Sequence, residues 1–392
     1  MTSTAERYRA YTGIALFSMG FRPFFLFSSV WAALTVPLWL AGYYGWTPQF
    51  TRDWHVHEML FGYLAGVIAG FLLTAIPNWT GRLPVAGWPL AGLFGLWCAG
   101  RLAMLFEASL GPASAIIDSL FLVALAFIVW REVLAGKNVR NLPICVIVTL
   151  FAAGNIAFHL RIPAPDALWL GERVALAVAA LLIALIGGRI VPSFTRNWMA
   201  KRAMRPETAT SDRFDIATLA LAGLALASWL VAPFSMMAGG ALMCAGFSLI
   251  VRLLRWRGWR TGGEPLVLIL HVGYFWLGAG LMLLGLAAFA PQFAPQSAGI
   301  HAIAAGAIGV MTLAVMTRAS RGHTGRELTA PWGTQLIYVL VNAGALARVA
   351  WAIAPTASMP LLGTSAMLWS SAFALFAFTY GRSLAVAPRP RR

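Results

Sequence analysis

The chain is built from one long apolar run after another, and this feature constrains its fold more than any other. An α-helix needs about 20 predominantly apolar residues to cross about 30 Å of hydrocarbon, and runs of this length recur from residue 21 to residue 383. Of the 392 residues, 60% are hydrophobic and only 11% are charged, whereas about a quarter of the residues in soluble domains are charged. The sequence therefore predicts a polytopic membrane protein.

The runs predict an all-α, polytopic transmembrane helical bundle with twelve spans. Transmembrane β-strands alternate apolar and polar residues over about ten positions, whereas these runs are longer and uniformly apolar. We expect one transmembrane domain, 1–392, in which the basic connection 189–212 is a candidate boundary between two six-span halves. The expected spans are 21–43, 54–76, 86–106, 112–131, 141–160, 166–188, 213–233, 236–254, 264–288, 298–317, 331–352 and 360–383.

The basic residues are distributed unevenly between the two sides of the predicted bundle. Only Arg52 and Arg161 fall in loops on one side, while the opposite loops and both termini carry most of the others. Because cytoplasmic loops carry the excess of Lys and Arg, we expect both termini in the cytoplasm. The net charge of +16 thus reflects topology. Binding to nucleic acid would need a basic soluble domain, and no loop is long enough to form one.

Histidines from three predicted spans lie at the end of the bundle opposite the basic loops. The second span begins with His55 and His57, the fifth ends at His159, and the tenth begins near His301. His55 and His57 are two positions apart and point about 200° away from each other on a regular helix. They cannot both ligate one metal from such a helix, so either His55 precedes it or the two serve different centres.

Carboxylate and amide side chains are spaced to orient two of these histidines. Glu58 follows His55 by three residues and shares its helix face, so its carboxylate could hold that imidazole as carboxylates hold metal-bound histidines. Asn155 precedes His159 by four residues and is placed to act on it in the same way.

Ionisable residues cluster at the same depth as the histidines. Such a side chain inside the membrane costs a few kcal/mol or more, and it normally faces the bundle interior with a partner. Ion pairs between Arg101 and Asp118, or between Arg173 and Glu172, would account for part of the cluster without a ligand. Its members are Arg101, Glu107, Asp118, Glu172, Arg173 and Arg348.

The histidines and arginines together suit a haem or a metal ion. Neutral imidazole is a ligand for haem iron, copper and zinc, and no CxxCH motif for covalent haem attachment is present, so a bound haem would be haem b. Arg101, Arg173 and Arg348 would suit the haem propionates, because a guanidinium pairs well with a carboxylate.

Two further histidines lie towards the basic side. His271 has Tyr274 one turn further along the same helix face, so the pair could form part of a proton path. His323 falls in a predicted loop or helix end, where a solvated side chain is the ordinary expectation.

Six segments of the chain resemble the NnrS family of bacterial membrane proteins. They follow the expected order over nearly the whole chain, and WHVHEMLFG and RASRGHTGR are the most distinctive parts. The segments are FSMGFRPFF (17–25), WHVHEMLFGYLAGVIAGFLLTAIPNWTGR (54–82), GNIAFH (154–159), GGRIVPSFTRN (187–197), EPLVLILHVGY (264–274) and HAIAAGAIGVMTLAVMTRASRGHTGR (301–326).

The resemblance implies a multi-pass protein of the bacterial inner (cytoplasmic) membrane that holds haem and copper. It also implies a link to nitric oxide, in denitrification or in resistance to nitrosative stress. His271 and His323 become candidate metal ligands, because both lie in matching segments. The resemblance does not assign individual histidines to haem or to copper.

We expect an outer site built from four histidines, with nitric oxide or nitrosyl species as its ligand. His57 and His301 are the expected iron or copper ligands, and His55 and His159 would complete the site. Redox turnover on nitric oxide would need an electron donor, either a quinol or a periplasmic carrier. The expected partners are therefore these small molecules and membrane lipid, with no nucleic acid.

A secondary transporter for a metal ion or small solute is the alternative. Twelve spans, cytoplasmic termini and a longer central connection fit that architecture, and the same histidines would then bind their cargo transiently. A coloured, stoichiometric cofactor in the purified protein would distinguish the two functions, because a transporter would lack it.

Overall fold

The computed structural model of the protein describes residues 11–164, 168–205, 211–356 and 359–386. These residues form an all-α bundle, in which β pairing is limited to one isolated bridge between Pro163 and Trp169. Twelve helices in the described ranges are long and apolar enough to cross a membrane. Each overlaps one predicted span, so the predicted fold class is confirmed.

Most spans are single α-helices, and three are interrupted by a π-helical segment. The uninterrupted helices are α2 (Phe21–Tyr43), α5 (Trp88–Leu105), α7 (Pro112–Ala135), α8 (Leu142–His159), α11 (Arg213–Val231), α12 (Met236–Leu254), α13 (Pro265–Leu286), α16 (Trp332–Ile353) and α17 (Met359–Ala385). The interrupted spans are α3 (Arg52–His57), η2 (Glu58–Leu64) and α4 (Ala65–Thr80); α9 (Leu170–Leu182), η4 (Ile183–Gly187) and α10 (Gly188–Ala200); and α14 (Gln296–His301), η6 (Ala302–Ile308) and α15 (Gly309–His323).

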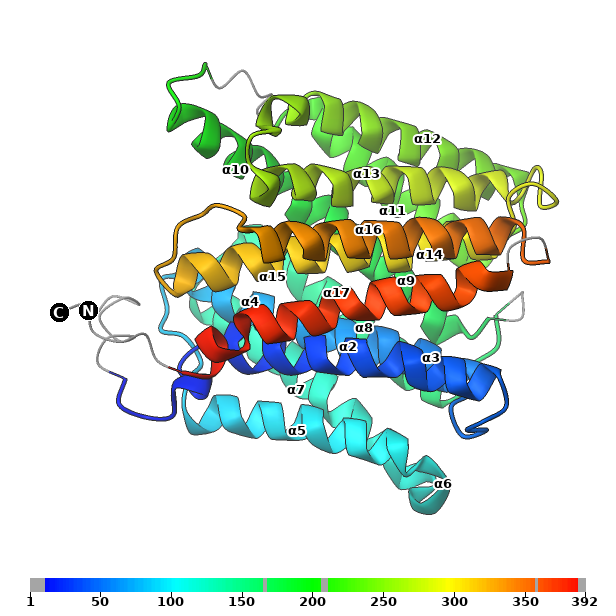
Figure 1. The fold of residues 1–392 in the computed structure, drawn as a ribbon, viewed down its shortest axis with the longest axis horizontal. Helices are drawn as coiled ribbons and strands as arrows, with labels where there is room; N and C mark the ends of the chain where they lie inside the picture. The colour runs from blue at the N-terminus through cyan, green and yellow to red at the C-terminus, as the bar shows by residue number, and fades with distance from the viewer. Residues whose placement is uncertain (1–10, 165–167, 206–210, 357–358, 387–392) are drawn as a thin grey trace.

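The spans lie side by side, roughly along the long axis of the molecule (Figure 1). The first and last of them, α2 and α17, pack against each other. Buried Arg22 near the start of α2 donates hydrogen bonds to the carbonyl oxygens of Ser383 (3.1 Å) and Leu384 (2.9 Å) near the end of α17. The described chain therefore begins and ends at the same end of the bundle. The side of the membrane on which that end lies stays a prediction.

The three interrupted spans and α13 occupy the interior of the bundle. In its most apolar stretch, the span from Arg52 to Thr80 has 83% of its residues buried, and the spans containing η4, η6 and α13 have 61%, 67% and 67%. The other spans have 33–44% buried, because one face of each is turned outward. Small residues permit this packing. At Gly299 in α14, for example, a Cβ would lie 2.5 Å from the backbone nitrogen of Leu284 in α13.

The sixth span differs most from its predicted range. The sequence predicts that Gly187, Gly188 and Pro192 weaken or kink the helix, whereas α10 continues through Pro192 as far as Ala200. The irregular turn lies just before it, in η4. A proline inside a membrane helix is tolerated when local backbone adjustments and neighbouring groups satisfy the freed carbonyl.

Each π segment has a backbone carbonyl that accepts a hydrogen bond from a side chain of another span. A π turn departs from the regular i→i−4 ladder, and polar backbone groups at membrane depth must be satisfied by the protein itself. The cross-helix bonds therefore anchor the irregular turns to their neighbours. The pairs are Trp97 Nε1 with Gly62 O of η2 (2.9 Å), Arg252 Nη1 with Ala184 O of η4 (2.9 Å) and Trp369 Nε1 with Ala305 O of η6 (3.2 Å).

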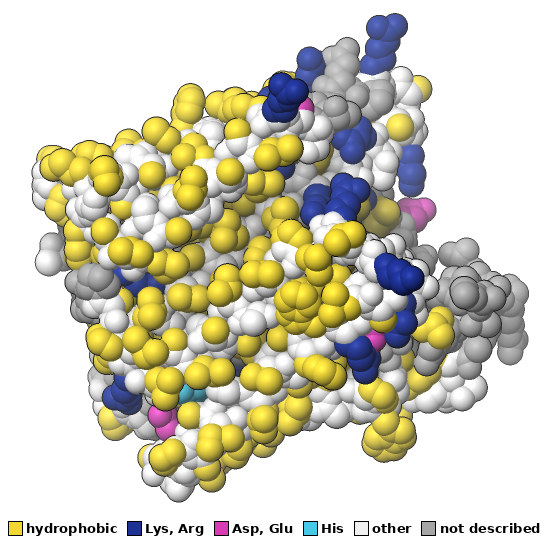
Figure 2. Space-filling view, turned by 180° about the vertical axis from the view of Figure 1, so that it is seen from behind, with side chains coloured by type: hydrophobic (Ala, Val, Ile, Leu, Met, Phe, Trp, Pro, Cys, Tyr) yellow, Lys and Arg dark blue, Asp and Glu magenta, His cyan; other side chains and the backbone are white. Residues whose placement is uncertain are grey.

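The surface is divided into an apolar body and a strongly basic end. In Figure 2, hydrophobic side chains cover most of the visible face, and the dark-blue Lys and Arg side chains gather towards the right-hand end. That end carries the first residues of α2 and the last residues of α10, α15 and α17. A histidine and acidic side chains are visible towards the opposite end.

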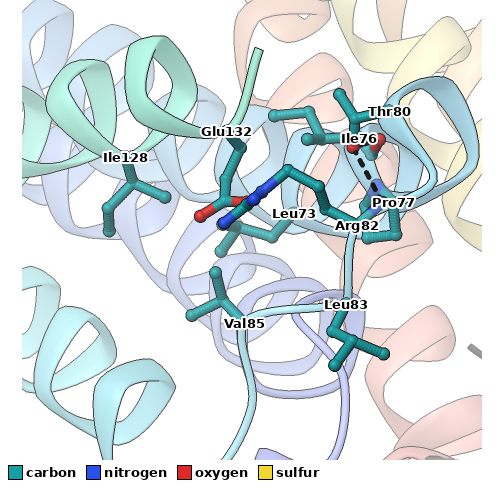
Figure 3. A pocket seen from close by; sticks show the side chains of 9 residues that line it. All are labelled: Leu73, Ile76, Pro77, Thr80, Arg82, Leu83, Val85, Ile128 and Glu132. Carbon is teal, nitrogen blue, oxygen red and sulfur yellow. Dashed lines mark hydrogen bonds and ion pairs between the residues drawn. The ribbon is translucent and has the colours of Figure 1, made fainter. Parts of the chain in front are cut away.

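A small pocket at the basic end is closed by an ion pair. Arg82 Nε donates to Glu132 Oε2 of α7 at 2.6 Å, and Arg131 also pairs with Glu132 at 2.7 Å. The space beneath them, lined by Leu73 and Ile128 among others (Figure 3), measures about 10 Å³. That volume holds no more than about one water molecule, so this pocket is structural.

Candidate metal centre

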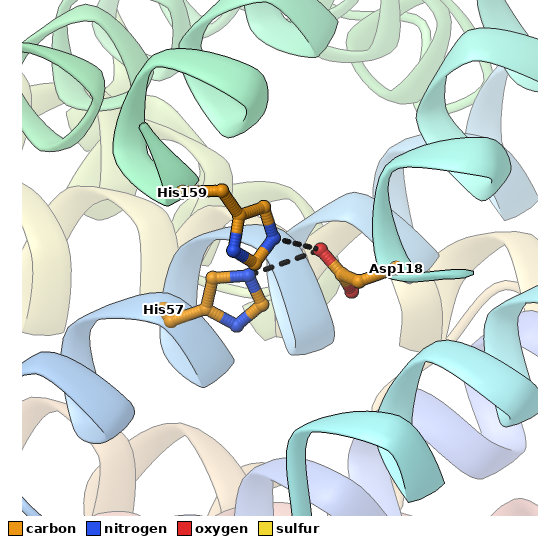
Figure 4. A group of neighbouring side chains, drawn as sticks. All are labelled: His57, Asp118 and His159. Atoms are coloured by element: carbon orange, nitrogen blue, oxygen red, sulfur yellow. Dashed lines mark hydrogen bonds and ion pairs between the residues drawn. The ribbon is translucent and has the colours of Figure 1, made fainter. Parts of the chain in front are cut away.

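Two histidines and an aspartate from three different spans converge at the end of the bundle opposite the basic residues. His57 ends α3, Asp118 lies in the first half of α7, and His159 ends α8. Asp118 Oδ2 lies 3.0 Å from His57 Nε2 and 2.9 Å from His159 Nε2, so one oxygen faces both rings (Figure 4). One ligand atom from each residue lies within 4.8 Å of the other two. Two imidazole nitrogens and a carboxylate oxygen form a donor set for zinc, copper or iron.

The residues around this cluster fix the orientation of each member. Glu58 Oε1 lies 2.8 Å from His57 Nδ1, which makes this carboxylate the second partner of the ring. Glu58 Oε2 accepts a hydrogen bond from Trp31 Nε1 at 2.6 Å. Arg101 of α5 pairs with Asp118 and lies 3.3 Å from Glu58. Both nitrogens of His57 therefore face carboxylates. With a metal ion at Nε2, Nδ1 would donate to Glu58, as the second ring nitrogen of metal-bound histidines donates to a carboxylate.

A glycine in η2 makes room for the guanidinium. A Cβ on Gly62 would lie 2.4 Å from Arg101 Nη1 and 2.7 Å from Glu58 Oε2, which is closer than real Cβ atoms approach. Any larger residue would push the Arg101 side chain away from both carboxylates.

The cluster needs one more positive charge than its arginine supplies. Glu58 and Asp118 are both buried and carry two negative charges when ionised, against the single guanidinium of Arg101. A buried charge without a partner is costly. Either a protonated imidazole at His57 or His159, or a bound cation, would supply the missing charge.

His55 and His301 belong to a second group, near Arg348 of α16. His55 stacks on Trp39 of α2, with ring centroids 4.4 Å apart, and its buried Nδ1 has no hydrogen-bond partner. His301 Nδ1 donates to the backbone oxygen of Ser297 at 2.7 Å, which leaves Nε2 with a free lone pair. His55, His301 and Arg348 lie within electrostatic range of one another.

The second group is also suited to a bound cofactor. Arg348 lies over the ring of Trp351 (4.6 Å to the centroid), and its Nη1 is buried without a hydrogen-bond partner. Buried polar atoms are almost always satisfied, so an orphaned one indicates a ligand, an ion or a water. An imidazole with a fixed tautomer, a second unpartnered imidazole and an available guanidinium match what a haem iron and a propionate require.

The remaining two histidines lie apart from both groups. His271 of α13 is buried, and its Nε2 lies 2.8 Å from Thr195 Oγ1 of α10. Tyr274 bonds elsewhere, since its hydroxyl accepts from Arg252 Nη1 at 2.8 Å. His323 ends α15 at the basic end and packs against the ring of Phe21, with centroids 5.3 Å apart. The structure thus brings His57 together with His159, and His55 close to His301.

Two expected pairings of charged residues have different partners in the structure. Glu58 contacts His57 and not His55, since its Oε1 lies 2.8 Å from His57 Nδ1. Glu172 binds Arg52 through both carboxylate oxygens, at 2.7 and 2.9 Å, and not Arg173. Arg173 donates to Leu230 O at 2.9 Å. The Arg101–Asp118 pair is confirmed.

A comparison with known protein families identifies the family of the chain. The model of the family described as NnrS protein matches residues 15–389. The chain belongs to the NnrS family. The comparison with curated proteins gives no match. In this NnrS protein, the motif WHVHEMLFG supplies one histidine to each group, and GNIAFH and the start of HAIAAGAIG supply the second histidine of each.

The sequence identified the histidines of the NnrS chain but not the residue between them. Asp118 was expected only as an ion-pair partner of Arg101, whereas it contacts both rings and Asn155 Nδ2 (2.8 Å) as well. A lone aspartate within an apolar run was the available signal. Asn155 donates a hydrogen bond to Asp118 and not to His159, and its Nδ2 also lies 3.3 Å from His57 Nε2.

Proposed function

We propose that this NnrS-family protein is a haem- and copper-binding protein of the bacterial inner membrane that handles nitric oxide, in denitrification or in resistance to nitrosative stress. The observation that carries the proposal is the division of the four outer histidines into two neighbouring groups. One group has a carboxylate and an arginine around it, and the other has unpartnered buried nitrogens. Two different centres account for two different environments.

We assign the copper ion to His57, His159 and Asp118, and the haem b to the group of His55, His301 and Arg348. The first set offers two nitrogens and one oxygen within 4.8 Å, which suits a metal ion that takes mixed donors. The second offers imidazole ligands and a guanidinium with a free nitrogen for a propionate. When bound, the iron and copper would supply open coordination positions for nitric oxide, and an electron donor such as a quinol or a periplasmic carrier would support turnover.

The residues of the chain have distinct tasks in this proposal. Glu58 and Asp118 hold the ring of His57, and Arg101 pairs with both carboxylates and holds them in place. The backbone oxygen of Ser297 holds His301 in one tautomer, with Nε2 as the ligand atom. Apolar helices surround the groups, which favours entry of an uncharged molecule over entry of ions.

The first test is a spectrum with metal analysis on the detergent-purified protein. We expect an oxidised-minus-reduced visible spectrum of haem b, with iron and copper both near one equivalent per chain by elemental analysis. Addition of nitric oxide to the reduced protein should shift the haem bands. A protein that stays colourless and metal-free when haem and copper are supplied would contradict the proposal and favour a transporter.

Variants test the assignment of each group. His57→Ala and His159→Ala should lose copper and keep the haem spectrum, whereas His55→Ala and His301→Ala should lose haem and keep copper. The control is Glu107→Gln, because Glu107 is an exposed acidic residue in α6 (Glu107–Leu110) at the same end. This variant should keep both haem and copper. Loss of both metals in every histidine variant would show that the four residues form a single site.

A further inference from the structure

An apolar cavity lies where the three interrupted spans meet. It measures about 90 Å³ and is bounded by residues of η2 and α4, of α9, η4 and α10, and of η6 and α15. Its walls are almost entirely apolar. The lining includes Leu64, Val67, Ile186, Ile308, Thr312 and Val315.

The cavity offers nothing that would hold water. Thr312 has the only side-chain hydroxyl in the lining, and its Oγ1 is 3.0 Å from Gly309 O and 2.5 Å from the hydroxyl of Tyr63. The hydroxyl therefore donates to Gly309 and accepts from Tyr63. A buried water needs two to four polar partners, and apolar cavities of comparable size stay dry and take up apolar molecules such as xenon.

The cavity begins close beneath the histidines and opens away from them. Leu64 and Ile308, which line the end of the cavity nearer the histidines, are buried. Leu64 is the last residue of the seven-residue segment η2, which follows His57, and Ile308 is the last residue of the seven-residue segment η6, which follows His301. Seven residues rise roughly 10 Å. Towards the basic end, Val315 and other lining residues are only half-buried.

We propose that this cavity binds a small apolar molecule of the size of a diatomic gas and holds it one π segment away from both histidine groups. Three features together favour an uncharged, weakly hydrated occupant that enters from the membrane. They are the volume of the cavity, the Thr312 hydroxyl with both its partners in place, and the half-buried residues towards the basic end. The identity of the gas as nitric oxide rests on the proposed function, whereas the binding of an apolar gas does not.

Xenon is the probe that tests the proposal on the purified, metal-loaded protein. Crystals pressurised with xenon should show an anomalous peak within 5 Å or so of Val67 and Ile186, as expected for an apolar cavity that takes up xenon. No xenon at this position, or an ordered lipid or detergent chain filling it, would overturn the proposal.

Two filling variants from different spans and one control complete the experiment. Val67→Phe in α4 and Ile186→Phe in η4 should each abolish the xenon peak. Val123→Phe adds the same volume on the exposed face of α7 and should keep it. Xenon that persists in both filling variants would place its site elsewhere and refute the assignment.

Metal content separates this proposal from the proposed function. Xenon bound in a protein that contains neither haem nor copper would confirm the cavity and refute the proposed function. Normal haem and copper content without bound xenon would refute the gas-binding cavity and leave the proposed function supported. Where all three are bound, the filling variants should also slow the rebinding of nitric oxide after photolysis, while Val123→Phe leaves it unchanged.

Discussion

At the scale of single residues, Asp118 has an unusual position for a carboxylate inside a membrane bundle. One oxygen faces two imidazole rings and an amide, and the other is paired with Arg101. Its burial is therefore offset by partners on four other side chains. Each histidine of the group has fewer partners than the aspartate that joins them.

We predict that Asp118→Asn destabilises the protein more than an exposed substitution would. The change removes the Asp118 charge from its pair with Arg101 and leaves the Nε2 atoms of His57 and His159 facing an amide. Breaking a buried ion pair in this way costs about 3–5 kcal/mol. Thermal unfolding in detergent should show a lowered midpoint, and copper should be lost with it. Arg101→Met should be destabilised as well, because it leaves the buried carboxylates of Glu58 and Asp118 without their guanidinium.

Glu107→Gln removes a carboxylate at the same end and gives the reference for this comparison, since Glu107 is exposed. If Asp118→Asn is as stable as Glu107→Gln, the Arg101–Asp118 pair contributes nothing to the stability of the protein. Many exposed ion pairs likewise contribute nothing measurable.

The sequence predicted which residues gather at this end and the pairing of Arg101 with Asp118, but not the other pairings. The separation of His55 from His57 follows from helix geometry alone, and the structure places them in different groups. The contact of Glu58 with His57 could not be predicted in this way, because neighbouring positions on a helix do not ordinarily face each other. The pairing of Glu172 with Arg52 depends on how a loop-end arginine folds back, which spacing along one helix does not encode.

At the scale of elements, the π segments depend on donors from other spans. We predict that Trp97→Phe destabilises the protein by about 1–3 kcal/mol, the cost of leaving a buried backbone carbonyl unsatisfied, because Gly62 O loses its cross-helix bond. Thermal unfolding in detergent measures this change. The position of His57 depends on the same turn, so copper retention should fall as well.

Trp130→Phe is the matched control for this experiment. Trp130 Nε1 donates to the hydroxyl of Thr149 at an exposed position, where the freed hydroxyl retains other partners. A loss of stability as large in Trp130→Phe as in Trp97→Phe would show that ring size, and not the π carbonyl, determines the effect.

The contact between α12 and α13 depends on glycines spaced seven residues apart on each helix. A Cβ on Gly246 would lie 2.5 Å from Gly278 O, and one on Gly239 would lie 2.8 Å from Gly285 O. We predict that Gly246→Ala lowers the thermal midpoint, because backbone atoms cannot move aside and overpacking costs about 1–3 kcal/mol. Gly92→Ala, where a Cβ meets nothing within 4 Å, should leave the midpoint unchanged.

The elements were predictable in number and approximate position, because hydrophobic length alone determines which segments can span a bilayer. The π segments were not, since an i→i+5 turn has no compositional signature in η2, η4 or η6. The proline of the sixth span illustrates the difference. Its sequence marks a weak point near Pro192, and the backbone places the irregular turn before Gly188.

At the scale of the whole molecule, the uneven distribution of basic residues predicts an orientation. We predict that a fluorescent protein fused after residue 392 is bright and that alkaline phosphatase fused there is inactive, because we expect the basic end to face the cytoplasm. Fusions within the connection that contains Arg161 should show the opposite result. Active phosphatase at the C-terminal fusion would place the histidine groups on the cytoplasmic side and remove the periplasmic donor from the proposal.

The contact between α2 and α17 joins two spans that lie near opposite ends of the described chain. Membrane spans emerge in chain order, with the N-terminal part first, so Arg22 enters the bilayer long before the carbonyls of Ser383 and Leu384 exist. Biogenesis must therefore keep α2 beside lipid or an insertion factor until α17 has been synthesised. A ribosome stalled before α17 would hold an open bundle, and the arrival of α17 is the event that closes it.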